Sequence, residues 1–426
     1  MSNFVFAGKD TVELAKKYGT PLYVMSGDMI NDKCDEINES FLNKYDNTMA
    51  VYASKAFLNL AMVKMVAKKG IGLDVVSGGE LYTAHKAGIN LENVMFHGNN
   101  KTASEIAMGI DLGVGRFVVD NRWEMYLINE LAQEKGKKVK ILFRITPGVK
   151  SDTHDYISTG QKDSKFGIPI VEDVIVDVVD EAMKLSNIKL MGLHFHVGSQ
   201  LHDNSSHLRA LDATFGILDK LYDKFTFVPK ELNVGGGFGI YYNKEDDVKP
   251  LSYFVDPIME KISGYFEKNG LDRAKVIIEP GRWIAGEAGI TLYKLTGKKE
   301  IPGIHRYISV DGGLPDNPRP ALYGAEYEAV VANKYGQEAA ETITIAGKCC
   351  ETGDILIKNI QLPITENGDY LAVMSTGAYN YSMASHYNRI PKAAVLMITE
   401  GREDIIVERE TYEDVISQDR VPSWLE

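Results

Sequence analysis

The stretch Thr48-Met49-Ala50-Val51-Tyr52-Ala53-Ser54-Lys55-Ala56 decides the fold, because it joins a strand to a helix through a lysine. Val51 and Tyr52 favour a strand, and residues 59–69 carry apolar side chains at helical spacing. Catalytic groups of parallel α/β proteins gather where such strands end. An amine at this point can attack a carbonyl carbon, as a Schiff-base lysine does. The alternative is a solvated lysine that opens a loop.

The same transition recurs along the chain up to about residue 282. Strand-like runs end, in chain order, at Lys55, Asp74, His97-Gly98-Asn99, Asp120, Arg144-Ile145-Thr146-Pro147, His194-Phe195-His196-Val197-Gly198-Ser199, Gly235-Gly236-Gly237 and Glu279-Pro280-Gly281-Arg282. Helical spacing is found between them, for example at residues 79–87, 102–112, 122–135, 171–185 and 206–224. Eight strands that alternate with helices and end in polar residues or glycine predict a (β/α)8 TIM barrel with its site at the carboxyl ends of the strands.

The alternation of strands and helices ends after about Ile284, where strand-like runs follow one another without long helical segments. These runs are residues 307–310, 328–331, 342–345, 355–357, 394–397 and 405–407. They predict a second, mostly antiparallel β domain, which the residues up to about Val24 complete.

Near the start of the chain, Asp28 is expected to cap a helix over residues 28–45. The predicted domains are therefore a barrel over residues 28–285 and a β domain made of residues 1–27 plus 286–426. Within the barrel, residues 152–165 form a polar insertion.

Composition narrows the function classes. The chain has 426 residues and a formal net charge of -12 at pH 7, which argues against nucleic acid as a partner. Its start lacks the basic and apolar segments of a signal peptide, and no apolar run is long enough to span a membrane. The three cysteines, Cys34, Cys349 and Cys350, cannot form a disulfide framework. We expect a cytoplasmic protein with reduced thiols.

The glycine run Gly235-Gly236-Gly237 follows the strand Leu232-Asn233-Val234. Glycines let backbone amides approach a phosphate closely, although such a run is also a common tight bend. The spacing differs from Gly-x-Gly-x-x-Gly and disfavours a dinucleotide site. Ser199 and Arg282, at neighbouring strand ends, can add a hydroxyl group and a cation to a phosphate site.

Glu279 and two histidines are further candidates. Glu279 precedes a proline and shares a strand face with Ile277. If that face lines the barrel, the carboxylate needs a partner, either an arginine or a protonated pyridine nitrogen. His194 and His196 point the same way, which suits a metal, a packed core or stacking on a planar cofactor. Because no histidine or cysteine cluster stands at the other strand ends except His97, we expect no metal.

The accumulated motifs are more specific together than any of them is alone. The barrel carries Tyr-Ala-x-Lys, His-x-His-x-Gly-Ser, Gly-Gly-Gly-x-Gly and Glu-Pro-Gly-Arg, and the β domain carries Arg-Pro-Ala-Leu-Tyr, Cys-Glu-Thr-Gly-Asp and Gly-Ala-Tyr-x-x-Ser-Met. From about Pro21 to Pro391 the chain resembles the alanine-racemase-like enzymes that use pyridoxal 5'-phosphate (PLP). Among their group IV decarboxylases, it looks specifically like the diaminopimelate decarboxylase family.

This resemblance implies PLP as the cofactor and gives roles to the candidates. Lys55 would bind PLP covalently, His196 would stack on its ring, and Glu279 would keep the ring nitrogen protonated. The further cofactor-binding residues are Asp74, Ser199, Gly235, Gly236, Gly237, Gly281, Arg282 and Tyr379. Cys350 would return a proton after carbon dioxide leaves, which makes Lys55, His196 and Cys350 the catalytic set. In the family this cysteine comes from the partner subunit, so a homodimer with composite active sites is implied.

The implied reaction is the decarboxylation of meso-2,6-diaminopimelate to L-lysine. The substrate-binding residues would be Arg282, Arg319, Tyr323, Glu351 and Tyr379. A guanidinium group reads a carboxylate at two points, which suits Arg319 to the distal carboxylate of this substrate. The alternatives are an amino-acid racemase on the same cofactor, a related basic amino-acid decarboxylase and a non-catalytic PLP-binding protein. Glu279 disfavours the racemase, and a β domain that carries Cys350 disfavours the non-catalytic protein.

Overall fold

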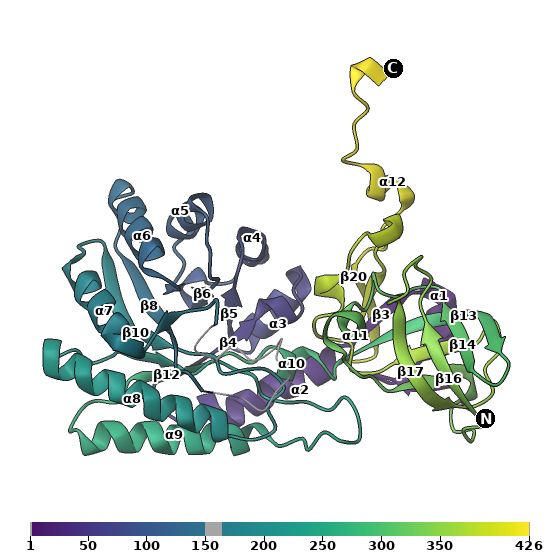
Figure 1. The fold of residues 1–426 in the computed structure, drawn as a ribbon, viewed down its shortest axis with the longest axis horizontal. Coiled ribbons are helices and arrows are strands. Elements are labelled where there is room, and N and C mark those ends of the chain that lie inside the picture. Colours follow the sequence, from purple (N-terminus) through teal and green to yellow (C-terminus); the bar gives the residue numbers. More distant parts are fainter. Residues whose placement is uncertain (1, 150–163, 426) are drawn as a thin grey trace. The chain divides into compact units, whose positions relative to one another are not determined.

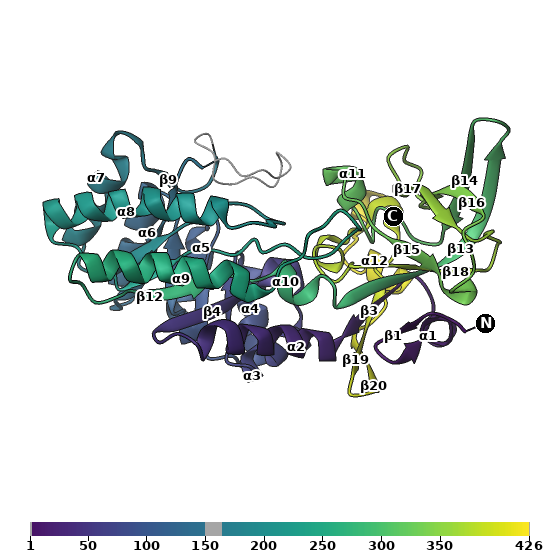
Figure 2. The same cartoon turned by 90° about the horizontal axis from the view of Figure 1, so that it is seen from below.

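The computed structural model describes residues 2–149 and 164–425, which form two compact units (Figures 1 and 2). The barrel unit consists of Asn31–Ile240 and Asp247–Ile284. The β unit consists of Met1–Ile30, Tyr241–Asp246 and Ala285–Glu426. The polar insertion expected at residues 152–165 lies outside the described residues, except for its last two.

The barrel unit is built on eight parallel strands. They are β4 (Thr48–Ala53), β5 (Gly72–Val75), β6 (Val94–Phe96), β7 (Arg116–Val119), β8 (Val139–Thr146), β10 (Ile188–His194), β11 (Glu231–Asn233) and β12 (Lys275–Ile278). Each strand pairs with the next, and β12 pairs with β4, so the sheet closes on itself. The short strand β9 (Ile168–Pro169) adds to β8. The predicted (β/α)8 barrel is confirmed.

Helices follow the barrel strands, as the helical spacing predicted. They are α3 (Leu60–Lys68), α4 (Gly78–Ala87), α5 (Ala103–Leu112), α6 (Arg122–Glu134), α7 (Val174–Lys184), α8 (Ser205–Phe225), α9 (Leu251–Lys268) and the short α10 (Arg282–Ala285). Helix α9 was not expected and contains Pro257 in its interior. It lies beside α8 in both views (Figures 1 and 2).

Side-chain caps fix where four of these helices begin. Asn59, Ser77, Thr102 and Asn121 each accept the backbone N–H of the third residue of the helix that follows. A cap satisfies one of the N–H groups that the first helical turn leaves without a partner. The loops after β4, β5, β6 and β7 are therefore short and ordered, and they hold the strand ends in place.

The barrel interior is apolar in its middle and charged at its amino end. Its central layer contains Val51, Met95, Val118, Leu142, Met191 and Ile277. At the amino ends of β7 and β11, Arg116 and Glu231 form a buried two-point ion pair, with Nε–Oε2 at 2.8 Å and Nη2–Oε1 at 2.6 Å. The two charges are paired by hydrogen bonds, as charges removed from water must be.

The β unit is a mixed sheet with mostly antiparallel pairs, as predicted. Its main strands are β3 (Leu22–Ser26), β13 (Gly289–Ile301), β14 (His305–Val310), β15 (Ala329–Val331), β16 (Glu341–Ala346), β17 (Ile355–Leu362), β18 (Tyr370–Val373), β19 (Ala394–Thr399) and β20 (Arg402–Val407). The order is β17-β16-β14-β13-β3-β19-β20, with β18 paired to β13 and β15. The pairs β14–β16 and β3–β19 are parallel. Strand β3 from the N-terminal segment lies in the middle of this order, so the early residues complete the domain.

The N-terminal segment also holds a small hairpin and two helices. Strands β1 (Val5–Phe6) and β2 (Lys9–Asp10) precede α1 (Thr11–Tyr18), which Asp10 caps. Helix α2 (Gly27–Ile37) follows β3. The expected cap at Asp28 is wrong: Ser26 Oγ accepts the N–H of Met29 at 3.2 Å, whereas Asp28 lies in the first turn and accepts the N–H of Glu400. The serine is one position before the helix, where its hydroxyl group reaches the third helical residue.

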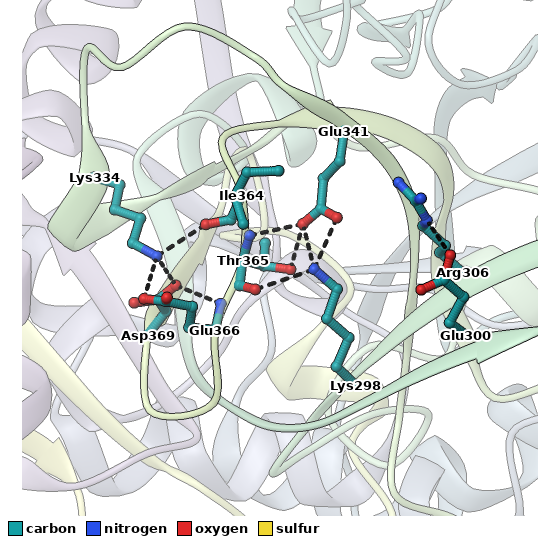
Figure 3. Close-up of polar contacts among 9 residues, drawn as sticks. All are labelled: Lys298, Glu300, Arg306, Lys334, Glu341, Ile364, Thr365, Glu366 and Asp369. Carbon is teal, nitrogen blue, oxygen red and sulfur yellow. Dashed lines mark hydrogen bonds and ion pairs between the residues drawn. The ribbon is translucent and has the colours of Figure 1, made fainter.

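Two groups of ion pairs hold the turn between β17 and β18 (Figure 3). Lys298 Nζ lies 2.8 and 2.9 Å from the two carboxylate oxygens of Glu341, which also accepts both the backbone N–H and the hydroxyl of Thr365. Lys334 binds Asp369 at 2.8 Å and Glu366 at 3.0 Å. These contacts are internal to the fold of the β unit.

A buried carboxyl group makes the stability of the β unit depend on pH. Asp316 is 2% exposed and accepts a hydrogen bond from the N–H of Gly313 at 2.9 Å. Burial raises the pKa of Asp316 to about 7, whereas an aspartate in an unfolded chain titrates near ~3.9. Between these values the folded state keeps a proton that the unfolded chain has released. The free energy of unfolding therefore falls as the pH rises through this window.

Asp316→Asn is expected to remove this pH dependence, because the amide does not titrate and its oxygen can still accept the N–H of Gly313. We expect the variant to gain stability relative to the wild type as the pH rises. The difference between their free energies of unfolding, measured by urea titrations, should grow by about 2–3 kcal/mol from about pH 5 to about pH 8. Parallel pH curves for the two proteins would contradict the assignment.

Candidate active site

The carboxyl ends of the barrel strands bring a polar cluster together around Glu279. The carboxylate follows β12, one layer above Ile277 of the apolar interior, and is 7% exposed. His97 Nε2, after β6, lies 2.9 Å from Oε1, and His194 Nε2, at the end of β10, lies 3.1 Å from Oε2. The amide of Asn233, at the end of β11, donates to Oε1 at 2.6 Å. Four strands thus contribute to one buried carboxylate.

The contacts keep Glu279 ionised, and burial keeps its neighbour His194 neutral. Burial alone would raise the pKa of Glu279, but its charge interactions and hydrogen bonds with His97 and His194 outweigh burial and hold this pKa well below its usual value. Burial also lowers the pKa of His194 to about 4, so its ring is neutral near pH 7. The site therefore presents a carboxylate charge inside the barrel, held in place by the side chains of His97, His194 and Asn233.

The trio of His97, His194 and Glu279 also has the composition of a metal site, with ligand-type atoms within 4.8 Å of one another. The sequence predicts that His194 and His196 point the same way; the structure groups His194 with His97, and these two rings meet edge to face at 4.9 Å. Asn233 Oδ1 accepts the N–H of Gly235 at 2.9 Å, which forces the amide N–H toward Glu279. A hydrogen-bond donor fixed on the carboxylate makes this a hydrogen-bonded cluster rather than a set of open ligands.

Lys55 and His196 lie near the same charges. Lys55 follows β4 in the short helix Ser54–Ala56 and is exposed, although Ser54 and Ala56 are buried. The charge of Lys55 acts on Asp74 and on His196, as does that of Arg144 on β8. Burial raises the pKa of Asp74 and lowers that of His196 well below its ordinary value.

The glycine run after β11 is packed between neighbouring loops. A Cβ atom on Gly236 would lie 2.0 Å from the carbonyl oxygen of Glu279, and one on Gly237 would lie 2.2 Å from that of Gly198. The carbonyl groups of Gly236 and Gly237 accept hydrogen bonds from His207 at 2.9 Å and from Leu201 at 2.9 Å. The N–H groups of Gly235 and Gly236 donate to Asn233 Oδ1 at 2.9 Å and to His196 Nδ1 at 3.4 Å, so what the run offers an anion is a close approach of the backbone rather than three unused N–H groups.

The other phosphate candidates lie in the same unit. Arg282 begins α10, directly after Glu279-Pro280-Gly281, and its Nη2 donates to Ser199 Oγ at 3.1 Å. Gly281 packs against β4, where an added Cβ would lie 2.9 Å from that of Ala53. A guanidinium group, a hydroxyl group and a glycine-rich turn fit a phosphate group, and a buried carboxylate fits a protonated pyridine. These residues therefore fit PLP.

The β unit holds the remaining candidates in two groups. Arg319 begins α11 (Arg319–Tyr323), is 7% exposed, and donates to the hydroxyl of Tyr327 at 2.5 Å and of Tyr242 at 3.3 Å. The ring centroid of Tyr379 lies 6.0 Å from its guanidinium carbon. Tyr323 ends the same helix and is half-buried.

Cys350 and Glu351 form the second group, at an exposed turn between β16 and β17. The neighbouring Cys349 differs from Cys350: burial and Asp354 raise the pKa of the Cys349 thiol to about 12. Cys350 is exposed and Cys349 is half-buried, so Cys350 is the more accessible of the two thiols.

Sequence reasoning missed several residues that the structure adds to these groups. His97 and Arg144 were marked as strand ends, but no role was given to them. Asn233 and Tyr242 carried no local signal, because their partners lie 46 and 77 residues away in the chain. Tyr327 lies only eight residues after its partner Arg319, but nothing in its residue type pointed to that contact.

Comparisons with known proteins agree with this geometry. Residues 28–286 match the family model described as pyridoxal-dependent decarboxylase, pyridoxal binding domain. The chain is 45% identical over 412 residues to the diaminopimelate decarboxylase of Bacillus subtilis, covering 97% of this chain and 94% of the relative. It superimposes with a TM-score of 0.93 on the crystal structure of diaminopimelate decarboxylase from M. jannaschii in co-complex with L-lysine. The two sequences are 35% identical, and the match covers 100% of this chain and 98% of that chain. The Helicobacter pylori enzyme complexed with L-lysine gives a TM-score of 0.87 at 32% identity, with 96% of this chain and 98% of that chain covered. With a full-length match and a barrel whose inner carboxylate suits a pyridoxal ring, the chain belongs to the diaminopimelate decarboxylase family of PLP-dependent decarboxylases.

Proposed function

We infer that the chain decarboxylates meso-2,6-diaminopimelate to L-lysine and carbon dioxide. The observation that carries this inference is the match to the Bacillus subtilis enzyme over 97% of the chain. The cluster around Glu279 supports the reaction type. PLP supplies an electron sink when it is bound, and an ionised carboxylate opposite its ring nitrogen strengthens that sink.

The barrel residues are proposed to bind and orient the cofactor. Lys55 holds it covalently, and His196 stacks on its ring. The phosphate group is bound by Ser199, Gly235, Gly236, Gly237 and Arg282, with Tyr379 of the β unit, while Asp74 and Gly281 complete the cofactor site. Glu279 binds the ring nitrogen, and His97, His194 and Asn233 keep its carboxylate in place.

The β-unit residues are proposed to select the substrate. Diaminopimelate has a distal carboxylate and a distal ammonium group, and L-lysine keeps both. Arg319 and Tyr323, with a share of Arg282 and Tyr379, bind the distal carboxylate, and Glu351 binds the ammonium. This distal binding positions the bond that breaks, so its loss lowers the rate as well as the affinity.

Cys350 is proposed to return a proton to the carbon that loses carbon dioxide, in the active site of a partner chain. Its exposed position, with Glu351, leaves both side chains accessible to another copy. The active form is thus a homodimer with composite sites.

We also propose the domain limits that the sequence predicts. The barrel domain spans residues 28–285, and the β domain is made of residues 1–27 plus 286–426.

We also propose that the protein works in the cytoplasm, because Cys34, Cys349 and Cys350 are all free thiols. Within the described residues, we find no helix with both the length and the apolar character that crossing a bilayer requires.

The function is tested by carbon dioxide release from meso-diaminopimelate. Equimolar L-lysine should form, and L-ornithine should release little carbon dioxide, because it has no distal carboxylate for Arg319. Loss of the optical activity of L-ornithine without carbon dioxide release would indicate a racemase instead, since meso-diaminopimelate has no optical activity to lose. Cofactor absorbance without turnover of either kind would indicate a PLP-binding protein.

Cys350→Ala is expected to keep PLP bound and to lower kcat by about a hundredfold, because general acid catalysis contributes roughly that much. The measurements are the absorbance of the bound cofactor and the initial rate of carbon dioxide release. Cys349→Ser is the matched control, since its hydroxyl group can still donate to Asp354, and it should retain the wild-type rate.

Mixing variants tests whether the cysteine acts in the partner's site. Random reassociation of Lys55→Ala and Cys350→Ala chains puts one intact site in each mixed dimer, so about a quarter of the wild-type activity should return. A mixture as inactive as its components would contradict the composite site. Wild-type turnover by Cys350→Ala would remove the thiol as the acid.

A further inference from the structure

The turn that carries Cys350 and Glu351 is anchored at its base by Asp354. This buried carboxylate accepts the N–H of Cys349 at 2.8 Å and the N–H of Leu314 at 2.7 Å. The base of the turn is therefore fixed to the body of the β unit. The backbone N–H of Asp354 also donates to the carbonyl of Glu351 at 3.2 Å, whereas the N–H of Cys350 and the side chain of Glu351 are bound by another segment.

Two consecutive residues bind the two residues of the tip. Asn388 Oδ1 accepts the backbone N–H of Cys350 at 2.8 Å. The hydroxyl of Tyr387 donates to Glu351 Oε2 at 3.0 Å. One contact fixes the backbone that carries the thiol, and the other fixes the carboxylate itself.

The segment that contains Tyr387 and Asn388 is held independently of this turn. His386 Nε2 lies 2.5 Å from Glu410 Oε2, and Arg389 Nη2 donates to Asp419 Oδ2 at 2.7 Å. The N–H of Ser385 donates to the carbonyl of Pro315 at 3.1 Å. The segment is thus a fixed support, to which the tip is attached.

The backbone of this support is in an unusual conformation. Asn388 and Arg389 have φ of 53° and 55°, in the left-handed region that residues other than glycine rarely adopt. Asparagine tolerates this region better than most residues. The left-handed turn is what directs the Asn388 side chain and the Tyr387 hydroxyl to neighbouring points of the tip.

These contacts contribute little to stability. Glu351, Tyr387 and the N–H of Cys350 lie at exposed positions, where water replaces a lost hydrogen bond. Their effect on the carboxylate is specific, however. Hydrogen bonds from the N–H of Gly353 and from Tyr387 hold the pKa of Glu351 below its ordinary value, so this carboxylate stays ionised.

We propose that Tyr387 and Asn388 are positioning residues for the reaction: Tyr387 orients the Glu351 carboxylate toward the distal ammonium of the substrate, and Asn388 orients Cys350 for proton return. The inference rests on the proposed roles of Cys350 and Glu351. It assigns substrate binding through Glu351 to Tyr387 and proton return through Cys350 to Asn388. Measurements of KM and kcat can separate these two effects.

Tyr387→Phe removes the donor to Glu351 and keeps the ring. The KM for meso-diaminopimelate should rise about fivefold to tenfold, and kcat should change less than about threefold, because proton return does not use this hydroxyl. The affinity for L-lysine, measured by calorimetry, should fall by a similar factor. Tyr412→Phe is the matched control, because Tyr412 is 80% exposed in the same unit.

Asn388→Gly removes the acceptor for the Cys350 N–H, and glycine accepts the left-handed backbone without strain. Here kcat should fall about tenfold, while KM and the L-lysine affinity stay within about twofold. Asn388→Asp keeps the acceptor oxygen and should restore most of kcat. Asn359→Gly is the matched control, since Asn359 is also an exposed asparagine with positive φ, 51°.

The inference is overturned if each variant behaves like its control, or if both variants lower kcat and L-lysine affinity together with the free energy of unfolding. Either result would leave the segment with a structural role at most. A wild-type chain that binds L-lysine but releases no carbon dioxide would instead overturn the proposed function, which the wild-type assay detects before any variant is compared.

Discussion

Lys55→Ala is expected to abolish decarboxylation, with a fall in kcat of at least about a thousandfold, because no other group can replace a covalent attachment to the cofactor. Lys55 follows β4 at the carboxyl end of the barrel, where its charge acts on Asp74 and His196. The absorbance of the bound cofactor near the visible edge should disappear in the variant. Persistence of that band would refute the assignment of Lys55.

Two other lysines make the test specific. Lys101 also lies near a strand end, but its Nζ donates to Glu124 at 2.6 Å and to the carbonyls of Gly98 and Val118, and it is 1% exposed. It is committed to three acceptors, as a structural lysine is. Lys64, exposed on α3, provides the control: Lys64→Ala should keep both the absorbance and the rate.

The barrel was predictable because its evidence is local and repeated. Each strand end, such as Asp74 or His194, follows a short apolar run and precedes a helical segment. Among the strands of the β unit that were not predicted, β13 and β18 lack that regularity. The burial of β13 changes along its 13 residues from both faces to one face and then to neither, and β18 has only four residues.

The site was predictable only where a residue type carried its own chemistry. Lys55, Glu279 and the glycine run could be named from their positions at strand ends. Asn233 and Asn388 could not, because an asparagine is uninformative until its partner is known. Their partners, Glu279 and Cys350, lie 46 and 38 residues away in the sequence.

Glu279→Gln is expected to lower kcat by about a hundredfold to a thousandfold while PLP stays bound through Lys55. The charge that keeps the ring nitrogen protonated is lost, so the electron sink weakens. The substitution also removes a hydrogen-bond acceptor from the cluster. Three nitrogen atoms, from His97, His194 and Asn233, lie within 3.1 Å of the two carboxylate oxygens, and an amide replaces one of these oxygens by an NH2 group.

The hydrogen bonds around residue 279 cannot all be kept when its carboxylate becomes an amide. Asn233 cannot turn its amide, because its oxygen is held by the N–H of Gly235, so a histidine must change tautomer or give up its bond. Glu231→Gln is the matched control: it also removes a buried carboxylate, from the pair with Arg116 at the amino ends of the strands. That variant should lower the free energy of unfolding by several kcal/mol, about 3–5, yet leave kcat of the folded protein unchanged. Equal losses of kcat in both variants would mean that Glu279 acts through barrel stability alone, whereas a loss confined to Glu279→Gln assigns it to the cofactor ring.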